Sequence, residues 1–235
     1  MLSLDSVQHL LSNHGPSNLL FLNQKINTRE RTEFYKTLAR LVFIGDYDNL
    51  LQPFMQPIIN VLIQLNTSLN NGQRNENQKN ALIGVCRDLR GIFSAALGSH
   101  TYGLLFNFIY PKHIRPLSIA SKVWGDTPEV MNPLLKFFME LVNTKGMRIK
   151  FPPSSPNGIL LFREISSVVV SYGNSLLNQP KPNDVNQEYS HWYKGNFTFY
   201  YYLDFLWGSI NINISFFSHT RYVIGIECNV TNIKW

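Results

Sequence analysis

The stretch SSPNGILLFRE, residues 154–164, decides how this chain folds, and its pattern continues to Tyr172-Gly173. Ser155 is a favourable helix N-cap, and Pro156 suits the first helical position, where its missing N–H costs nothing. The apolar residues recur from there at spacings of 3, 4 and 7, namely Leu161, Ile165, Val168, Val169, Tyr172 and Leu176. This one-sided pattern predicts a capped amphipathic helix that packs against other helices in an all-α protein.

The same helical periodicity recurs along the chain before residue 154. The clearest helix is predicted over residues 79–97, with Gly98 as its C-cap and a buried stripe of Leu82, Val85, Cys86, Leu89, Ile92, Phe93 and Ala96. Other helices are predicted over residues 2–11, 28–44, 50–65, 101–110, 113–124 and 128–142. Because the connections are short, consecutive helices should be antiparallel neighbours. About three helical hairpins fit between residues 28 and 177.

Four local expectations depend on single residues in these helices. Thr28 and Thr127 should cap the helices that follow them, as Ser155 does. Phe34, Leu38, Leu41 and Val42 should form the buried side of the helix over residues 28–44. Pro53 and Pro57 predict a kink or a late start in the helix over residues 50–65. Residues 66–77, which are rich in Asn, should form a polar loop and are the best candidate for disorder before residue 79.

The composition fits a soluble protein with a moderate basic excess. The 235 residues are 44% hydrophobic and carry a net charge of +6, with a mean hydropathy of −0.11 and an isoelectric point near 9.3. Residues 112–150 concentrate the excess, with seven Lys or Arg against three acids. Such a region can attract acidic partners or nucleic acid, or it can be the solvated edge of a helical repeat. No run of five basic residues occurs, which favours the solvated edge.

No sequence motif indicates catalysis, a metal site or a cofactor. The nucleophile, phosphate-loop and zinc-protease signatures are absent, and the six histidines are scattered. Cys86 is expected to be a reduced thiol in the core, and no Cys/His spacing fits zinc. Residues 197–207 are too short to span a membrane, so no membrane insertion is expected. The same aromatic residues lack interleaved Lys and Arg, so no nucleic-acid binding is expected either.

Three stretches of the chain resemble a known family in the same order. Residues 154–164 with Tyr172-Gly173 are similar to a segment of the exportin-7 branch of nuclear transport receptors, whose relatives include the Ran-binding proteins of the importin-β superfamily. The other two stretches are ALIGVCRDLRGI at residues 81–92, and DTPEV followed by PLLKF at residues 126–137. The resemblance extends from Thr32 to Gly195. It implies an all-α, HEAT/armadillo-like helical repeat solenoid.

The resemblance also divides the chain into three parts. Residues 1–27 should form an N-terminal helix and linker, and residues 28–195 the HEAT-like helical repeats of exportin-7 type. Residues 196–235 should be a divergent tail that is irregular or β-like. This tail is dense in aromatic residues, and apolar residues alternate with period two over residues 210–216, which is typical of a strand.

The function that the resemblance implies is binding. Such a receptor binds the small GTPase Ran in its GTP form and protein cargo, and it passes through the nuclear pore between nucleus and cytoplasm. It is not an enzyme, since the GTP belongs to Ran. The cargo and the direction of transport stay open. The alternatives are a generic helical-repeat scaffold that binds a protein partner, or a truncated product without transport activity.

Charged residues on the predicted helices and their connections are the candidates for partner binding. Each could instead be structural, for example as part of an ion-pair group within one helix. In HEAT arrays, the second helices of the hairpins line the concave surface that holds partners. The candidates are Arg87, Asp88, Arg90, Lys136, Lys145, Arg148, Lys150, Arg163 and Glu164.

Overall fold

A computed structural model of the chain describes residues 5–15, 18, 19, 22, 28–44, 47–72, 74–152 and 154–178. Within these residues the regular structure is helical and contains no strand, as the apolar periodicity predicts. The α-helices are α1 (Asp5–Ser12), α2 (Thr28–Ile44), α3 (Tyr47–Asn70), α4 (Glu76–Ala95), α5 (Ser99–Ile109), α6 (Arg115–Val123), α7 (Pro128–Val142) and α8 (Asn157–Leu177), and the short 3-10 helix η3 (Lys145–Met147) lies between α7 and α8. The tail predicted over residues 196–235 lies outside the described residues.

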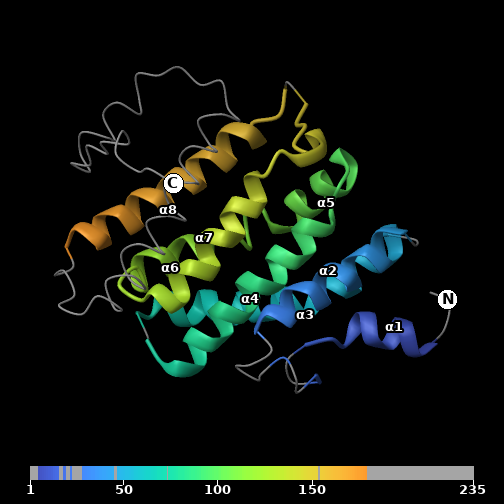
Figure 1. The fold of residues 1–235 in the computed structure, drawn as a ribbon, viewed down its shortest axis with the longest axis horizontal. Helices are drawn as coiled ribbons and strands as arrows, with labels where there is room; N and C mark the ends of the chain where they lie inside the picture. Colours follow the sequence, from blue (N-terminus) through green and yellow to red (C-terminus); the bar gives the residue numbers. More distant parts are fainter. Residues whose placement is uncertain are drawn as a thin grey trace, which may run out of the picture.

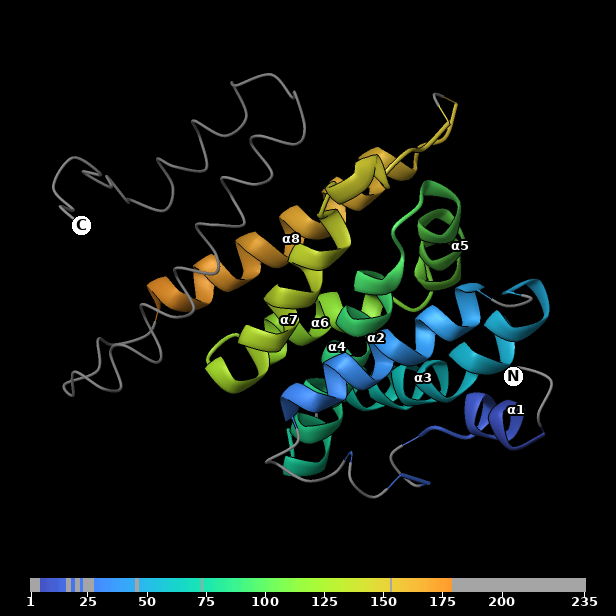
Figure 2. The same ribbon diagram turned by 45° about the vertical axis from the view of Figure 1, so that its right-hand side comes forward.

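The helices stack in two layers. The first layer holds α1, α3, α6 and α8, each packed on the next, and the second layer holds α2, α4 and α7. Packing between α2 and α3, between α3 and α4 and between α6 and α7 joins the layers. Figures 1 and 2 show α1 and α8 at opposite ends of this array. Helical hairpins stacked in this order form a HEAT/armadillo-type solenoid, so the predicted fold class is confirmed.

Helix α4 is the centre of the second layer and forms as the sequence predicts. Every residue of its predicted stripe is buried. It begins earlier than expected, because Asn75 accepts a hydrogen bond from the Gln78 backbone while the Gln78 side chain accepts one from the Asn75 backbone. The prediction of Gly98 as its C-cap is wrong. The helix is capped at Ala96, and Gly98 is the N-cap residue of α5.

Helix α8 also follows its prediction, but its packing partner differs. The Ser155 hydroxyl accepts a hydrogen bond from the Asn157 backbone N–H at 3.3 Å. The stripe from Leu161 to Tyr172 is buried. We expected this stripe to pack on residues 128–142, yet α8 packs chiefly on α6. The reason is the layered arrangement, in which each helix stacks on the previous helix of its own layer. A 3.0 Å hydrogen bond from the Ser118 hydroxyl of α6 to the Glu164 carboxylate of α8 joins these two helices.

Helix α3 overturns two predictions. It begins at Tyr47, before both of its prolines, so the expected late start is wrong. It also runs to Asn70, so the predicted loop over residues 66–77 shrinks to the few residues before α4. Leu65 and Leu69 are both buried and continue the apolar stripe. Thr67 and Asn70 are exposed, and the Thr67 hydroxyl donates to the carbonyl of Ile63 four residues back.

Two single-residue expectations in other helices are also wrong. Leu41 is 36% exposed, because the buried side of α2 is formed by Tyr35, Leu38, Ala39 and Val42. Thr127 occupies the N-cap position of α7, but its side chain makes no cap hydrogen bond. Its hydroxyl instead accepts from Arg74 Nη2 at 2.9 Å. No helix among the described residues has the length and apolar character to cross a membrane.

Candidate partner-binding surface

The α4 segment that carries Arg87, Asp88 and Arg90 places these three charges in different surroundings. Asp88 is 3% exposed and faces α2, where Arg31 donates two hydrogen bonds to its carboxylate. Burial raises the pKa of Asp88, and the Arg31 guanidinium opposes that shift. Arg31 also donates to the carbonyl of Leu22. Asp88 therefore joins two helices of the fold, and we remove it from the candidate binding residues.

Close approach of α2 to α4 makes this internal pair possible. A Cβ atom added at Gly84 would lie 2.9 Å from the Arg31 guanidinium carbon, so the Arg31 side chain would have to shift to admit it. A Cβ atom at Gly91 would collide with the carbonyl oxygen of Thr32. The face of α4 toward α2 therefore consists of Gly84, Asp88 and Gly91, spaced by four and three residues. This second stripe was present in the sequence, and we missed it because it is not apolar.

Arg87 and Arg90 lie on α4 outside the stripe of Gly84, Asp88 and Gly91, and both reach the surface of the second layer. Both are half-buried, and no carboxylate in the described part of the chain pairs with either one. Burial lowers the pKa of Arg87, and the nearby positive charges of Arg31 and Arg90 lower it further. A half-buried guanidinium beside two others favours a bound anionic group, because a carboxylate would offset the repulsion among them.

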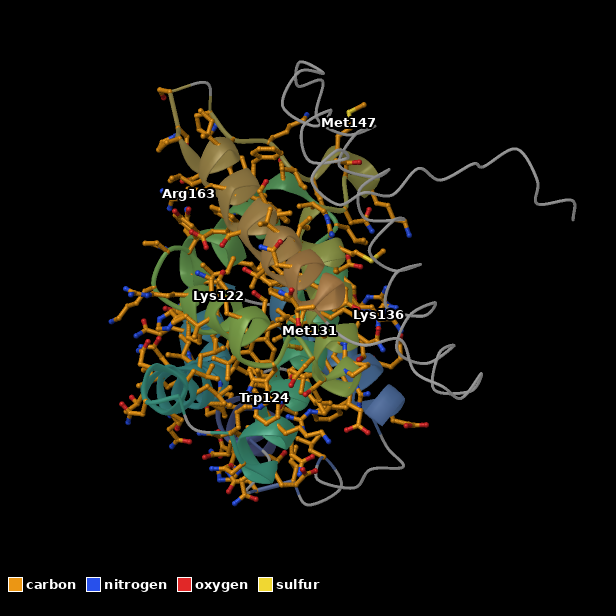
Figure 3. All side chains as sticks on the ribbon, turned by 90° about the vertical axis from the view of Figure 1, so that its left-hand side faces the viewer. Lys122, Trp124, Met131, Lys136, Met147 and Arg163 are labelled. Carbon is orange, nitrogen blue, oxygen red and sulfur yellow. The ribbon has the colours of Figure 1, made fainter. Side chains whose placement is uncertain are left out.

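Lys136 lies on α7, the next helix of the same layer. Helices α4 and α7 run in parallel, since Lys79 pairs with Glu129 near their first turns and the rings of Phe93 and Phe137 meet further along at 5.8 Å. Lys136 directly precedes Phe137. Figure 3 shows Lys136 and Met147 on one side of the molecule, and Lys122 and Arg163 on the other.

Arg148 is buried and belongs to the core of the fold. Its guanidinium donates to main-chain carbonyls at the C-terminal ends of two helices, namely Phe93 and Ala96 of α4 and its cap, and Glu140 and Asn143 of α7 and its cap. It also pairs with the Glu140 carboxylate at 2.7 Å and lies over the Tyr102 ring. With 2% of its surface exposed it is not available to a partner, and we remove it from the candidates too.

The remaining candidates lie at the edge of the array and on the first layer. Lys145 and Lys150 are exposed on the connection between α7 and α8. Arg163 is exposed near the start of α8, where it donates to the Tyr110 hydroxyl at 3.2 Å and to Glu164 at the same distance. Glu164 is largely covered and also accepts from Ser118. The nine candidates are therefore not one site but two buried structural residues and charges on both layers.

The described residues offer little else that could be a chemical site. No group of His, Cys, Asp or Glu among them is arranged to hold a metal ion. Cys86 lies in the core, as predicted, and burial raises the pKa of its thiol. The features of the described chain that stand out are therefore its helical surfaces and the Arg87 and Arg90 guanidinium groups on α4.

Comparison with known proteins identifies relatives that share this segment. The chain is 37% identical to exportin-7-B of Xenopus laevis over 185 residues, 36% identical to Ran-binding protein 17 of Homo sapiens over 185 residues, and 37% identical to exportin-7 of Dictyostelium discoideum over 172 residues. These matches cover 75%, 76% and 72% of this chain, respectively. The chain spans only about 17% of the length of these relatives. No protein-family model matches the chain, and no solved structure matches it significantly.

Proposed function

This chain belongs to the exportin-7 family over about three quarters of its length, and on that premise we propose that it is a protein-binding segment of a nuclear export receptor. We propose that Ran in its GTP form and protein cargo are its partners, and that it acts at the nuclear pore between nucleus and cytoplasm. The observation that carries the proposal is the sequence relationship to exportin-7 and Ran-binding protein 17 over 185 residues. Its role is binding and not catalysis.

Within this proposal, the second-layer surface is the contact region. Arg87 and Arg90 on α4 are its central pair, and Lys136 on α7 extends it along the next helix. The unpaired guanidinium groups support this assignment, because they are half-buried cations that gain more from a partner carboxylate than a fully exposed lysine does. Lys145, Lys150 and Arg163 are further candidates at the edge and on the first layer. We also propose that the chain divides into three parts, namely residues 1–27, 28–195 and 196–235.

A pull-down with purified Ran tests the proposal. The full chain is immobilised and offered Ran loaded with GDP or with a GTP analogue that is not hydrolysed. The proposal predicts retention of the GTP form only. The variant Arg87→Ala/Arg90→Ala should reduce that retention, whereas Lys112→Ala/Lys122→Ala removes the same charge from exposed positions that are not among the Ran-contact candidates, and it serves as the matched control. Equal retention of the two nucleotide forms contradicts the Ran assignment.

The second candidate function is a helical-repeat scaffold that binds a protein partner without Ran. The observation that favours it is the stacked helical array itself, because such arrays present extended surfaces that suit many protein partners. A chain that retains neither form of Ran in the pull-down, while remaining folded by circular dichroism, supports this second function. The two functions therefore give opposite results in one experiment.

A further inference from the structure

We propose a second interaction surface, on the first layer, that binds an acidic segment of a partner protein. The surface consists of Lys112, Arg115, Lys122 and Arg163, and we name it the α6 ridge. It lies on the other side of the molecule from Lys136, as the labelled positions of Lys122 and Arg163 in Figure 3 show. It is independent of Ran and of the second-layer surface described above.

The ridge is built by α6 and the turns that flank it. Arg115 and Lys122 are seven residues apart on α6, so they project from the same face of the helix, and both are exposed. Lys112 is exposed in the turn before α6. Arg163 comes from α8, which packs on α6, and its bond to the Tyr110 hydroxyl holds it beside that turn. Three segments thus bring four cations to one side of the layer.

The helices around the ridge carry little negative charge. Residues 49–70 of α3 contain no charged side chain, and α6 carries only Arg115 and Lys122. Helix α8 carries only Arg163 and Glu164, and the Glu164 carboxylate already accepts hydrogen bonds from Arg163 and Ser118. No carboxylate of the described residues pairs with the side chains of Lys112, Arg115 or Lys122. The positive charge of Lys112 also contributes to lowering the pKa of the adjacent His113, after the larger effect of burial. Cations gathered without counter-ions attract an acidic surface.

The chemistry favours an acidic protein segment over nucleic acid. Single-stranded nucleic acid usually requires exposed aromatic rings on which bases stack. Arg163 contacts Tyr110 through its hydroxyl, and this ring is half-buried and stacked on Phe106 with ring centroids 5.3 Å apart. Arg115 and Lys122 are about 10 Å apart along the helix at 1.5 Å per residue. Carboxylates three residues apart on a peptide in the polyproline II conformation lie on the same side and about 9 Å apart, so a segment rich in Asp or Glu fits the ridge.

Fluorescence anisotropy with a labelled oligo-glutamate peptide tests the proposal, with oligo-glutamine as the neutral peptide. The full chain is titrated without Ran or nucleotide. Wild type should bind oligo-glutamate, and binding should weaken as salt is raised. The variant Lys112→Gln/Arg115→Gln/Lys122→Gln should weaken binding at least about 10-fold, since three ion pairs are lost. Arg163 is kept, because its hydrogen bonds make it part of the fold as well as of the ridge.

The matched control removes three charges elsewhere, in Arg40→Gln/Lys145→Gln/Lys150→Gln, and should change affinity by less than about 2-fold. A third variant, Lys112→Glu/Arg115→Glu/Lys122→Glu, should bind oligo-lysine in place of oligo-glutamate, and a glutamate at the first position of α6 favours the helix. Failure of wild type to bind oligo-glutamate overturns the proposal, as does an equal loss in the control. Tighter binding of oligo-uridine than of oligo-glutamate through the same residues overturns it in favour of nucleic acid.

Discussion

Arg31 on α2 and Asp88 on α4 form a buried two-point ion pair, in which Nε lies 2.5 Å from Oδ1 and Nη2 lies 2.6 Å from Oδ2. The two side chains are 9% and 5% exposed. The pair joins adjacent helices of the second layer at the point where Gly84 and Gly91 allow them to approach. A charged pair in this position fixes the register of α2 against α4, because sliding one helix along the other would break both hydrogen bonds.

The first prediction follows from removing one member of this pair. Asp88→Asn leaves the Arg31 guanidinium buried without a counter-charge and should lower the free energy of unfolding by about 3–5 kcal/mol. Asp126→Asn is the control, since Asp126 forms a similar two-point pair with Arg74 at the surface and should cost about 1 kcal/mol or less. Urea denaturation followed by circular dichroism measures both. Equal losses in the two variants would contradict the role given to Asp88.

The second prediction concerns pH and the buried His14. Its Nε2 lies 2.7 Å from the Phe54 carbonyl and its Nδ1 lies 3.2 Å from the Tyr35 hydroxyl. Burial lowers the pKa of His14 below its usual 6.5, so the unfolded chain takes up a proton at a higher pH than the folded chain does. Stability from the neutral ring is therefore complete above about pH 6.5 and is lost as the pH falls through the lower, folded pKa.

The measurement is the urea midpoint at several pH values between neutral and mildly acidic. Wild type should lose stability on acidification below about pH 6.5, at up to about 1.4 kcal/mol for each unit of pKa difference. His14→Gln keeps a donor for Phe54 but does not titrate, so its midpoint should change less with pH. His113→Gln is the matched control, because His113 is less buried and should contribute less. A wild-type midpoint that does not fall on acidification sinks this prediction.

How far the sequence predicts the structure depends on the kind of pattern. Apolar stripes are strong signals, because they must be buried whatever their neighbours are. The buried stripe of α4, and that of α8 as far as Tyr172, were therefore predicted correctly. The length of α3 was not predicted, because its last turn is polar on the outside and its two buried leucines were outweighed by the asparagines around them. The prolines were given too much weight as signals of a late helix start, because Pro53 and Pro57 both lie inside α3.

Charged residues were the least predictable part of the candidate site. A single helix cannot reveal whether an aspartate faces solvent or a neighbour 57 positions away in sequence, as Asp88 faces Arg31. Arg148 is similar, since its partners are main-chain carbonyls from two helices and carbonyls leave no trace in a sequence. Arg87 and Arg90 were predicted to lie off the buried stripe of α4, and the structure leaves both partly exposed. Their role as a binding site stays a prediction.

The third prediction tests the close approach of α2 and α4. Gly91→Ala would place a methyl group against the Thr32 carbonyl and within 3.1 Å of the Lys36 backbone nitrogen. The helices must then separate, which should destabilise the protein by about 1–3 kcal/mol although alanine is the better helix former. Gly103→Ala is the control on α5, where a Cβ atom meets nothing within 4 Å, and it should be neutral or stabilising by up to about 1 kcal/mol. The two melting temperatures should therefore shift in different directions, and a Gly91→Ala variant as stable as wild type would show that the helices have room.

The fourth prediction concerns Arg148, which caps α4 and α7 together. Its donors reach the Phe93 carbonyl at 2.6 Å and the Asn143 carbonyl at 2.7 Å, so one guanidinium neutralises the negative ends of two helix dipoles. Arg148→Met keeps the volume but removes these charged donors, and the Phe93 carbonyl keeps the Ala96 backbone N–H. Hydrogen bonds to a charged group contribute about 1.5–3 kcal/mol each. The loss should therefore be about 3 kcal/mol or more. Arg148→Lys should recover part of it, since an ammonium keeps the charge but cannot span both helix ends.

Lys150→Met is the matched control for Arg148→Met. Lys150 lies two residues after Arg148 but is exposed, so this variant removes one positive charge from the surface. It should change the free energy of unfolding by no more than about 0.5 kcal/mol. Hydrogen exchange gives a second, local readout. If Arg148 joins the two helices, Arg148→Met should speed amide exchange in the last turns of both α4 and α7, while the first turn of α4, held by Asn75 and Gln78, stays protected. Faster exchange at the end of α7 alone would mean that Arg148 serves its own hairpin and does not tie it to the one before.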